Sequence, residues 1–156
     1  MKLTVLAIGL RQPGWADDAW ADYAKRFPPE MRLELKALKA EPRQGGKTAA
    51  QCMAAEAQRI TTALPKGARK VVLDEHGTRL STAALAQRLQ AWRADGRDIS
   101  FIIGGPDGLD PQVRQAADES FRLSDLTLAH AFVRVLLAET LYRAWSLLEG
   151  HPYHRE

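Results

Sequence analysis

An apolar run passes directly into a glycine-rich turn in Ile99-Ser100-Phe101-Ile102-Ile103-Gly104-Gly105-Pro106-Asp107-Gly108. A short run of this kind, bounded by turn residues, is typical of a strand buried on both faces of a parallel sheet. The three glycines allow the backbone to turn sharply and to approach a ligand closely. The segment therefore predicts an inner strand with a candidate binding loop at its carboxyl end, although a plain Pro-Asp-Gly turn explains the same residues.

Outward from this strand, strand-like and helix-like segments alternate along the whole chain. Further strands are expected at residues 2–9, 70–74 and 121–123, and a strand with one wet face, near a sheet edge, at residues 32–38. Apolar residues at helical spacing predict helices at residues 15–27, 48–64, 82–93 and 129–149, with a short helix that begins at Asp110-Pro111. This order predicts an α/β fold with a mostly parallel sheet and helices on both faces.

The composition fits one globular domain that spans residues 1–156. The chain has 46% hydrophobic and 26% charged residues, which excludes disordered, collagen-like and coiled-coil classes. The single cysteine, Cys52, forms no intramolecular disulfide and is expected to be a small buried side chain. The amino-terminal residues lack the pattern of a signal peptide, and no apolar run is long enough to span a membrane, so a cytoplasmic protein is expected.

The net charge of +3 permits a polyanionic partner without requiring one. Residues 1–47 contain nine basic and six acidic side chains, so the whole positive surplus lies in this first third. Five of these basic residues are candidates for a surface patch that would face such a partner: Arg32, Lys36, Lys39, Arg43 and Lys47.

Ligands of parallel sheets bind outside the carboxyl ends of the strands. Three such ends are candidates here, at residues 73–75, 104–108 and 123–128. The glycine spacing does not match the dinucleotide fingerprint, and no phosphate-loop lysine follows, so neither a Rossmann cofactor nor a nucleoside triphosphate is supported.

The last predicted helix is apolar on two sides, so both sides should be buried, either inside the domain or half against a partner subunit. Glu139 and Arg143 stand four residues apart and can form an ion pair. Arg134 has no acidic residue at helical spacing, so we expect it to face a ligand or another chain, or to be solvated.

The carboxyl-terminal tail offers side chains that suit nucleic acid. Tyr153, His154 and Arg155 together can stack on a base, exchange a proton and bind phosphate, whereas a flexible polar tail is the simpler interpretation. Cys52 lies far from the histidines in sequence, so no metal site is expected.

Several segments match one known family at once. They are residues 103–109, 123–128 and 133–136, then Glu139, residues 141–144 and the ending His151-Pro152-Tyr153-His154-Arg155-Glu156, together with the Met-Lys-Leu start and the Tyr23 and Arg26-Phe27-Pro28 segment. The chain therefore strongly resembles the large-subunit ribosomal RNA methyltransferase H family of the SPOUT class, along its whole length. It departs from that family at Ala129-His130-Ala131, where prolines often flank the histidine.

The resemblance implies a SPOUT-type α/β fold with a carboxyl-terminal trefoil knot, and a homodimer without metal or membrane partner. It implies transfer of a methyl group from S-adenosyl-L-methionine to N3 of a pseudouridine in helix 69 of 23S rRNA, on the assembled ribosome. By position, the cofactor-binding residues are Leu73, Gly104, Leu123, Ser124, Asp125, Leu126, Thr127 and Leu128, with backbone groups reading the adenine and the glycines leaving space for the cofactor.

The target N3 carries a proton, so the reaction needs a base or a group that stabilises the resulting anion. His154 is the first candidate for the base, Tyr153 for contact with the nucleobase, and Arg155 for phosphate or developing charge. Arg143 is a second-tier candidate, as is Arg134. Two alternatives stay open: a SPOUT methyltransferase with another rRNA or tRNA target, and a non-catalytic ribosome-associated factor of the same fold.

Overall fold

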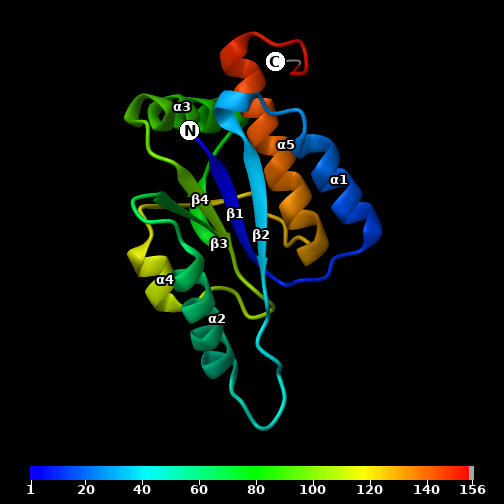
Figure 1. Ribbon diagram of the computed structural model, residues 1–156, viewed down its shortest axis with the longest axis vertical. Coiled ribbons are helices and arrows are strands. Elements are labelled where there is room, and N and C mark those ends of the chain that lie inside the picture. The colour runs from blue at the N-terminus through cyan, green and yellow to red at the C-terminus, as the bar shows by residue number, and fades with distance from the viewer. Residues whose placement is uncertain (155–156) are drawn as a thin grey trace.

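The computed structural model describes residues 1–154 and contains one sheet of five strands in the order β2-β1-β4-β3-β5. Every paired strand runs parallel to its neighbour (Figure 1), which confirms the predicted parallel sheet. The strands are β1 (Leu3–Ile8), β2 (Leu33–Leu38), β3 (Arg69–Arg79), β4 (Ile99–Ile103) and β5 (Glu119–Arg122). Their carboxyl ends therefore meet at one edge of the sheet.

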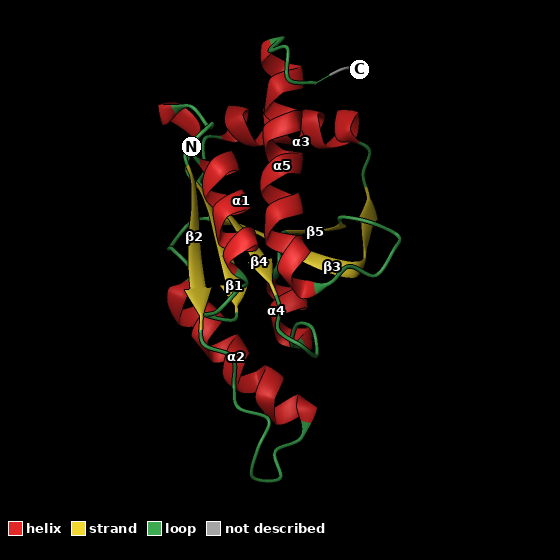
Figure 2. Cartoon of the chain, turned by 90° about the vertical axis from the view of Figure 1, so that its right-hand side faces the viewer, coloured by secondary structure: helices red, strands yellow, loops and turns green. Residues whose placement is uncertain are grey.

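Helices cover both faces of the sheet, as predicted. One face carries α1 (Gly14–Ala24), α3 (Thr82–Asp95) and α5 (His130–Glu149), whereas α2 (Ala49–Ala63) and α4 (Pro111–Ala116) pack on the other (Figure 2). A short 3-10 turn, Pro29–Met31, precedes β2. Within residues 1–154, no helix is both long enough and apolar enough to cross a membrane.

The core lies around β4, in which every residue is buried. Its side chains alternate between the two layers, so Phe101 packs under α3, where its ring centroid lies 5.8 Å from that of Trp92. Ile102 points to the other layer, toward Ile60 of α2 and Val113 of α4. The strand is therefore sealed on both faces, as its uninterrupted apolar pattern predicts.

Local capping explains where the helices begin. Thr48 and Gln51 form a capping box at the start of α2, and the hydroxyl of Ser81 accepts a hydrogen bond from the Ala84 amide at the start of α3. The predicted helix at residues 15–27 ends at Ala24 instead. Its last residue, Phe27, stands before Pro28, and a residue in that position disfavours the helical conformation.

The third strand is longer than predicted. Residues 75–77 were expected to end it, but β3 continues to Arg79 after an irregularity between Leu73 and Thr78, and both of these residues pair with Phe121 of β5. A Cβ atom on Gly77 would lie 2.8 Å from the Phe121 backbone, so only glycine fits this crossing. Residues 74–77 thus form a bulge in β3 that has no paired residue in β5. The trefoil knot stays a prediction.

Candidate active site

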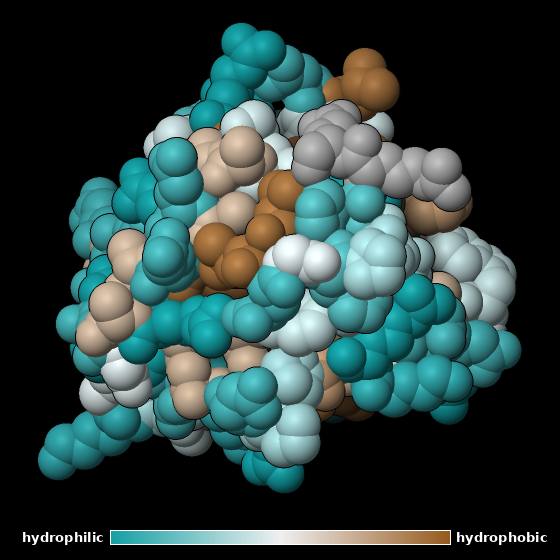
Figure 3. All heavy atoms as spheres, turned by 90° about the horizontal axis from the view of Figure 1, so that it is seen from above, coloured by the Kyte–Doolittle hydropathy of each residue, from teal (hydrophilic) through white to brown (hydrophobic). Residues whose placement is uncertain are grey.

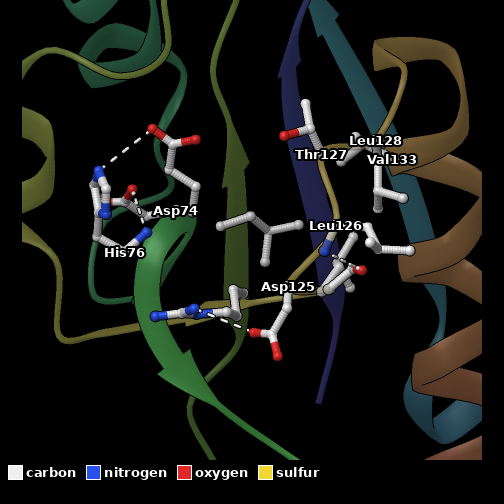
Figure 4. A pocket seen from close by; sticks show the side chains of 12 residues that line it. Asp74, His76, Asp125, Leu126, Thr127, Leu128 and Val133 are labelled. Carbon is white, nitrogen blue, oxygen red and sulfur yellow. Dashed lines mark hydrogen bonds and ion pairs between the residues drawn. The ribbon is translucent and has the colours of Figure 1, made fainter.

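A pocket of about 350 Å³ lies beside the bulge of β3 and the carboxyl end of β5, within the size range of small-molecule sites. Leu73 to His76 form one wall, residues 122–128 form the other, and Val133 of α5 closes the apolar side (Figure 4). Seven of the eight predicted cofactor-binding residues, Leu73 and Leu123 through Leu128, therefore line a single pocket.

The eighth residue, Gly104, lines an adjoining pocket of about 420 Å³. The two pockets share residues 73–76 and Val133, so they form one continuous hollow around the end of β3. The glycine-rich loop at residues 104–108, Arg114 and His130 complete the second pocket. The three strand ends singled out from the sequence are thus brought together.

The loop at residues 123–128 is attached to the sheet through Asp125. The guanidinium groups of Arg79 and Arg122 both form ion pairs with its carboxylate. Arg122 also donates a hydrogen bond of 2.9 Å to the carbonyl of Gly77. Leu126, by contrast, is 77% exposed. The loop therefore has a fixed base and an uncovered apolar tip.

The glycine-rich loop is tightly folded on itself. Gly108 N–H donates to the carbonyl of Gly105 at 3.0 Å, and a Cβ atom on Gly104 would lie 2.7 Å from the carbonyl carbon of Gly108. An added Cβ atom at Gly104 or Gly105 would therefore meet the protein itself, and the expectation that the glycines leave space for the cofactor stays a prediction.

The described part of the tail, residues 151–154, packs against α5. The hydroxyl of Tyr153 donates to Glu139 Oε1 at 2.9 Å and lies 3.0 Å from the hydroxyl of Tyr23. His154 Nδ1 lies 3.1 Å from the Ser146 hydroxyl, which itself donates to the carbonyl of Arg143. The flexible-tail interpretation is thus wrong for these residues, whereas Arg155 lies outside the described residues.

Arg143 and Glu139 form the expected ion pair, with an Nη2–Oε1 distance of 2.5 Å. This pairing raises the pKa of the Arg143 guanidinium. The same guanidinium lies 5.1 Å from the centre of the Tyr153 ring, in cation–π geometry. Burial, together with hydrogen bonds to Tyr23 and Glu139, raises the pKa of Tyr153 well above its usual value. Tyr153 is therefore a neutral hydrogen-bond donor at physiological pH.

The tail cluster and the pocket lie at opposite ends of α5. The helix starts beside the carboxyl edge of the sheet and ends near the amino terminus of the chain (Figure 1). Its 20 residues span about 30 Å at 1.5 Å per residue. Tyr153, His154 and Arg143 are therefore remote from the predicted cofactor residues of the same chain. The tail end of the molecule presents a few hydrophobic residues among mostly hydrophilic ones (Figure 3).

Arg134 does not face a ligand or solvent, so that expectation is wrong. Its side chain is buried, and Nη2 donates to the carbonyls of Ile8 at 3.3 Å and Gly9 at 2.6 Å, at the carboxyl end of β1. Burial lowers the pKa of its guanidinium, which Asp17 partly opposes. Arg134 therefore fastens α5 to the sheet.

The family described as "Predicted SPOUT methyltransferase" matches residues 1–154. The chain belongs to the SPOUT methyltransferase family. Two similar proteins, from Leptothrix cholodnii and Methylibium petroleiphilum, are each named ribosomal RNA large subunit methyltransferase H. Each is 64% identical to this chain over 156 residues, which cover 100% of both sequences. A similarly named protein from Delftia acidovorans is also 64% identical over the full length.

A solved structure has a similar fold. The crystal structure of TrmJ from Z. mobilis superposes with a TM-score of 0.51 at 14% identity, covering 100% of this chain and 72% of that one. This likeness shows that a distant sequence adopts a similar fold.

Sequence reasoning missed three residues that line this SPOUT pocket: His76, Arg122 and Val133. His76 lies just beyond the strand predicted at residues 70–74, and Val133 lies within the helix predicted at residues 129–149. The position of His76 directly after a strand was a usable signal, because ligands bind at strand ends. Among residues 1–154 no cluster of His, Cys, Asp and Glu side chains could hold a metal ion.

Proposed function

We propose that this chain transfers a methyl group from S-adenosylmethionine to ribosomal RNA of the large subunit. The observation that carries the proposal is full-length identity of 64% to proteins named for that activity. The target we infer is N3 of pseudouridine 1915, in helix 69 of 23S rRNA on the assembled ribosome.

The residues around the pocket fit S-adenosylmethionine. Leu73, Leu128 and Val133 provide an apolar wall for a flat base, and the irregular backbone of residues 123–128 offers amide and carbonyl groups for its polar edge. Asp74 and Glu75 supply carboxylates beside this wall, which suit hydroxyl groups and positive charge. Bound S-adenosylmethionine supplies an electrophilic methyl group, so the protein needs mainly to align the acceptor and exclude water.

His154 is suited to accept the proton from N3. The Ser146 hydroxyl has one hydrogen and donates it to the Arg143 carbonyl at 2.7 Å, so its oxygen accepts a hydrogen bond from His154 Nδ1. In the neutral imidazole, Nε2 then carries the free lone pair. The proton moves from the nucleobase nitrogen to this Nε2 atom, while the ring is kept in orientation by Ser146.

Tyr153 and Arg143 orient the same tail. Glu139 accepts hydrogen bonds from both side chains, so the Tyr153 ring is fixed against α5 and presents an edge for contact with the nucleobase. Since its raised pKa keeps Tyr153 protonated, it is not the base. The proposed role of Arg155, binding phosphate or stabilising charge, completes the set.

We infer a homodimer, because one chain keeps its tail about the length of α5 away from its own pocket. Trp15 and Phe132 are each 48% exposed and pack together, with ring centroids 4.8 Å apart, at the pocket end of the α1 and α5 layer. Phe132 shares one helix face with Leu136, Glu139 and Arg143, at spacings of four, three and four residues.

A twofold axis perpendicular to α5 would pair two such faces in antiparallel fashion. Each tail would then lie beside the partner's pocket, so that two copies complete each active site.

Mapping of isotope-labelled methyl groups by mass spectrometry, after incubation with methylation-deficient ribosomes, tests the target. Label on the helix 69 pseudouridine supports the proposal, whereas label elsewhere in rRNA or in tRNA indicates another SPOUT target. A calorimetric titration with S-adenosylmethionine separates these outcomes from a non-catalytic factor, which would show no binding and no label.

A further inference from the structure

Glu56 of α2 has a buried carboxylate, with only 3% of the side chain exposed. A buried charge is costly unless it is paired and hydrogen-bonded. Arg43 donates to both carboxylate oxygens, through Nη1 at 2.5 Å and Nη2 at 3.4 Å, and the amide of Glu41 donates at 3.0 Å. The Glu56 carboxylate thus holds the loop between β2 and α2 through its hydrogen bonds with Glu41 and Arg43.

Arg43 uses the other side of its guanidinium on the glycine-rich loop. Its Nε and Nη2 atoms donate to Asp107 Oδ2 at 3.2 and 3.0 Å. These contacts with two carboxylates raise the pKa of Arg43. One planar cation therefore joins α2 to the loop that follows β4, a geometry that lysine cannot reproduce.

Glu56 also contacts the glycine-rich loop directly. A Cβ atom on Gly105 would lie 3.0 Å from Glu56 Oε1 and 2.9 Å from Ile8 Cγ2. The glycine-rich loop is therefore supported at Gly105 by Glu56 and at Asp107 by Arg43.

The opposite side of the loop faces ligand space. Gly104, Pro106, Asp107 and Gly108 line the pocket that also includes His76 and His130. Neither Glu56 nor Arg43 lines either of the two adjoining pockets. Any influence of these two residues on a bound cofactor must therefore act through the loop.

We propose that Glu56 and Arg43 are positioning residues, which hold the glycine-rich loop in the shape that binds S-adenosylmethionine. The proposal rests on the proposed function, because it assumes that this pocket binds that cofactor. It also removes Arg43 from the predicted RNA-facing patch, since its guanidinium is already engaged by two carboxylates.

The test compares R43K and R43A with the wild type in calorimetric titrations with S-adenosylmethionine. Lysine keeps a positive charge beside Glu56 but cannot span both carboxylates, so R43K should fold and yet bind the cofactor roughly tenfold more weakly, the size of effect that lost supporting hydrogen bonds have at other sites. In steady-state assays the KM for the cofactor should rise, while kcat at saturating cofactor and the KM for ribosomes stay unchanged.

Asp107 provides the coupling test. The R43K substitution should weaken binding much less in a D107N background than in the wild type, because both changes cut the same link. The matched control is R59A. It removes an ion pair of 3.0 Å with Glu41, which lies with Arg43 in the loop between β2 and α2, and it leaves the contacts of residues 104–108 unchanged. R59A should bind the cofactor as the wild type does.

Wild-type cofactor affinity in R43K and R43A would overturn the positioning role. So would a loss of ribosome affinity with cofactor affinity intact, which would return Arg43 to the RNA-facing patch. If R43A does not fold, R43K and D107N still decide the question. Absence of binding by the wild-type protein would instead refute the proposed function.

Discussion

Tyr153 is a single residue whose environment determines its protonation. Its folded pKa lies above its unfolded value of about 10, first because of burial and then because of hydrogen bonds to Tyr23 and Glu139. The stability that follows from this shift is complete below pH 10 and is lost as the pH rises through the folded pKa.

We therefore expect an ultraviolet titration of tyrosinate to contain a high-pH step that Y153F removes. The E139Q variant should move that step to lower pH, because the carboxylate disfavours a neighbouring phenolate. A Tyr153 that ionises at the pH of a free tyrosine would contradict the structure. Circular dichroism at each pH checks that the protein is still folded.

Arg134 stabilises the fold through hydrogen bonds to backbone carbonyls. The R134A substitution leaves the buried carbonyls of Ile8 and Gly9 without these donors, and each lost charged hydrogen bond costs about 1.5–3 kcal/mol. We expect urea unfolding to show a free energy of unfolding lower by roughly 3–6 kcal/mol, with an unchanged m-value. R93A, which breaks an exposed ion pair with Glu149, should change it by less than about 1 kcal/mol. Equal effects of the two substitutions would be inconsistent with this assignment.

The same residue shows where sequence reasoning ends. Helical spacing reveals side-chain partners such as Glu139 and Arg143, but it cannot reveal a partner that is a carbonyl 125 residues away. The segments that line the pocket could be located from the sequence because apolar runs mark the strands that precede them, whereas their role in cofactor binding stays a prediction. The pairing of Glu56 with Arg43 joins a helix to a loop, and no periodicity marks it.

At the scale of elements, the loop at residues 123–128 depends on its attachment to β3 and β5. Arg79 lines neither of the two adjoining pockets, so its ion pair with Asp125 can influence a ligand only through the loop at residues 123–128. We expect R79A to weaken S-adenosylmethionine binding in calorimetry, with little change in Tm because exposed ion pairs contribute only about 0–1 kcal/mol. E149Q is the control, since Glu149 pairs with Arg93 at the far end of α5. If D125N weakens binding and R79A does not, Asp125 contacts the cofactor directly instead.

Strand prediction succeeded where a local apolar or alternating pattern marks the strand, and it failed where no such pattern exists. The inner strands β1 and β4 are almost wholly buried, so their apolar runs identify them. The second half of β3 is mostly exposed and polar, and becomes a strand by pairing with β5. Such pairing is a tertiary effect, which a local pattern does not contain.

At the scale of the whole molecule, the separation of tail and pocket predicts complementation between two defective chains. A variant lacking residues 151–156 should form dimers in light scattering and bind S-adenosylmethionine, but not methylate ribosomes. L126R, a change at an exposed side chain of the pocket, should fold and lose cofactor binding. Mixed dimers contain one intact site, so an equimolar mixture should recover about a quarter of wild-type activity.

No recovery in that mixture, with both variants shown to exchange subunits, would mean that each chain uses its own tail. A monomeric mass for the wild type would exclude the dimer altogether. Full activity of the truncated chain would remove the tail from the mechanism.

The predicted RNA-facing patch is a property of the molecular surface, and most of its members form ion pairs. In the structure Arg43 pairs with Glu56 and Asp107, Lys47 with Glu41, and Arg32 with Glu34. Within residues 1–154, Lys36 and Lys39 are exposed and form no ion pair, so they are the freest members of the patch. K36E/K39E should weaken ribosome binding and reduce the salt dependence by roughly one unit of slope per lost phosphate contact. K66E, a control change of one exposed lysine outside the patch, should have no effect; unchanged binding by the double variant would remove the patch.

The contacts of α5 with the end of β1 have a consequence for biosynthesis. The first strand to leave the ribosome is an inner strand of the sheet, and its terminal carbonyls are bound by Arg134, with His130 Nε2 3.1 Å from the Ile8 carbonyl. These partners are translated more than a hundred residues later, so the amino-terminal half of the nascent chain has no complete sheet to join. The native fold is therefore completed only after the last helix has left the ribosome and is free to dock.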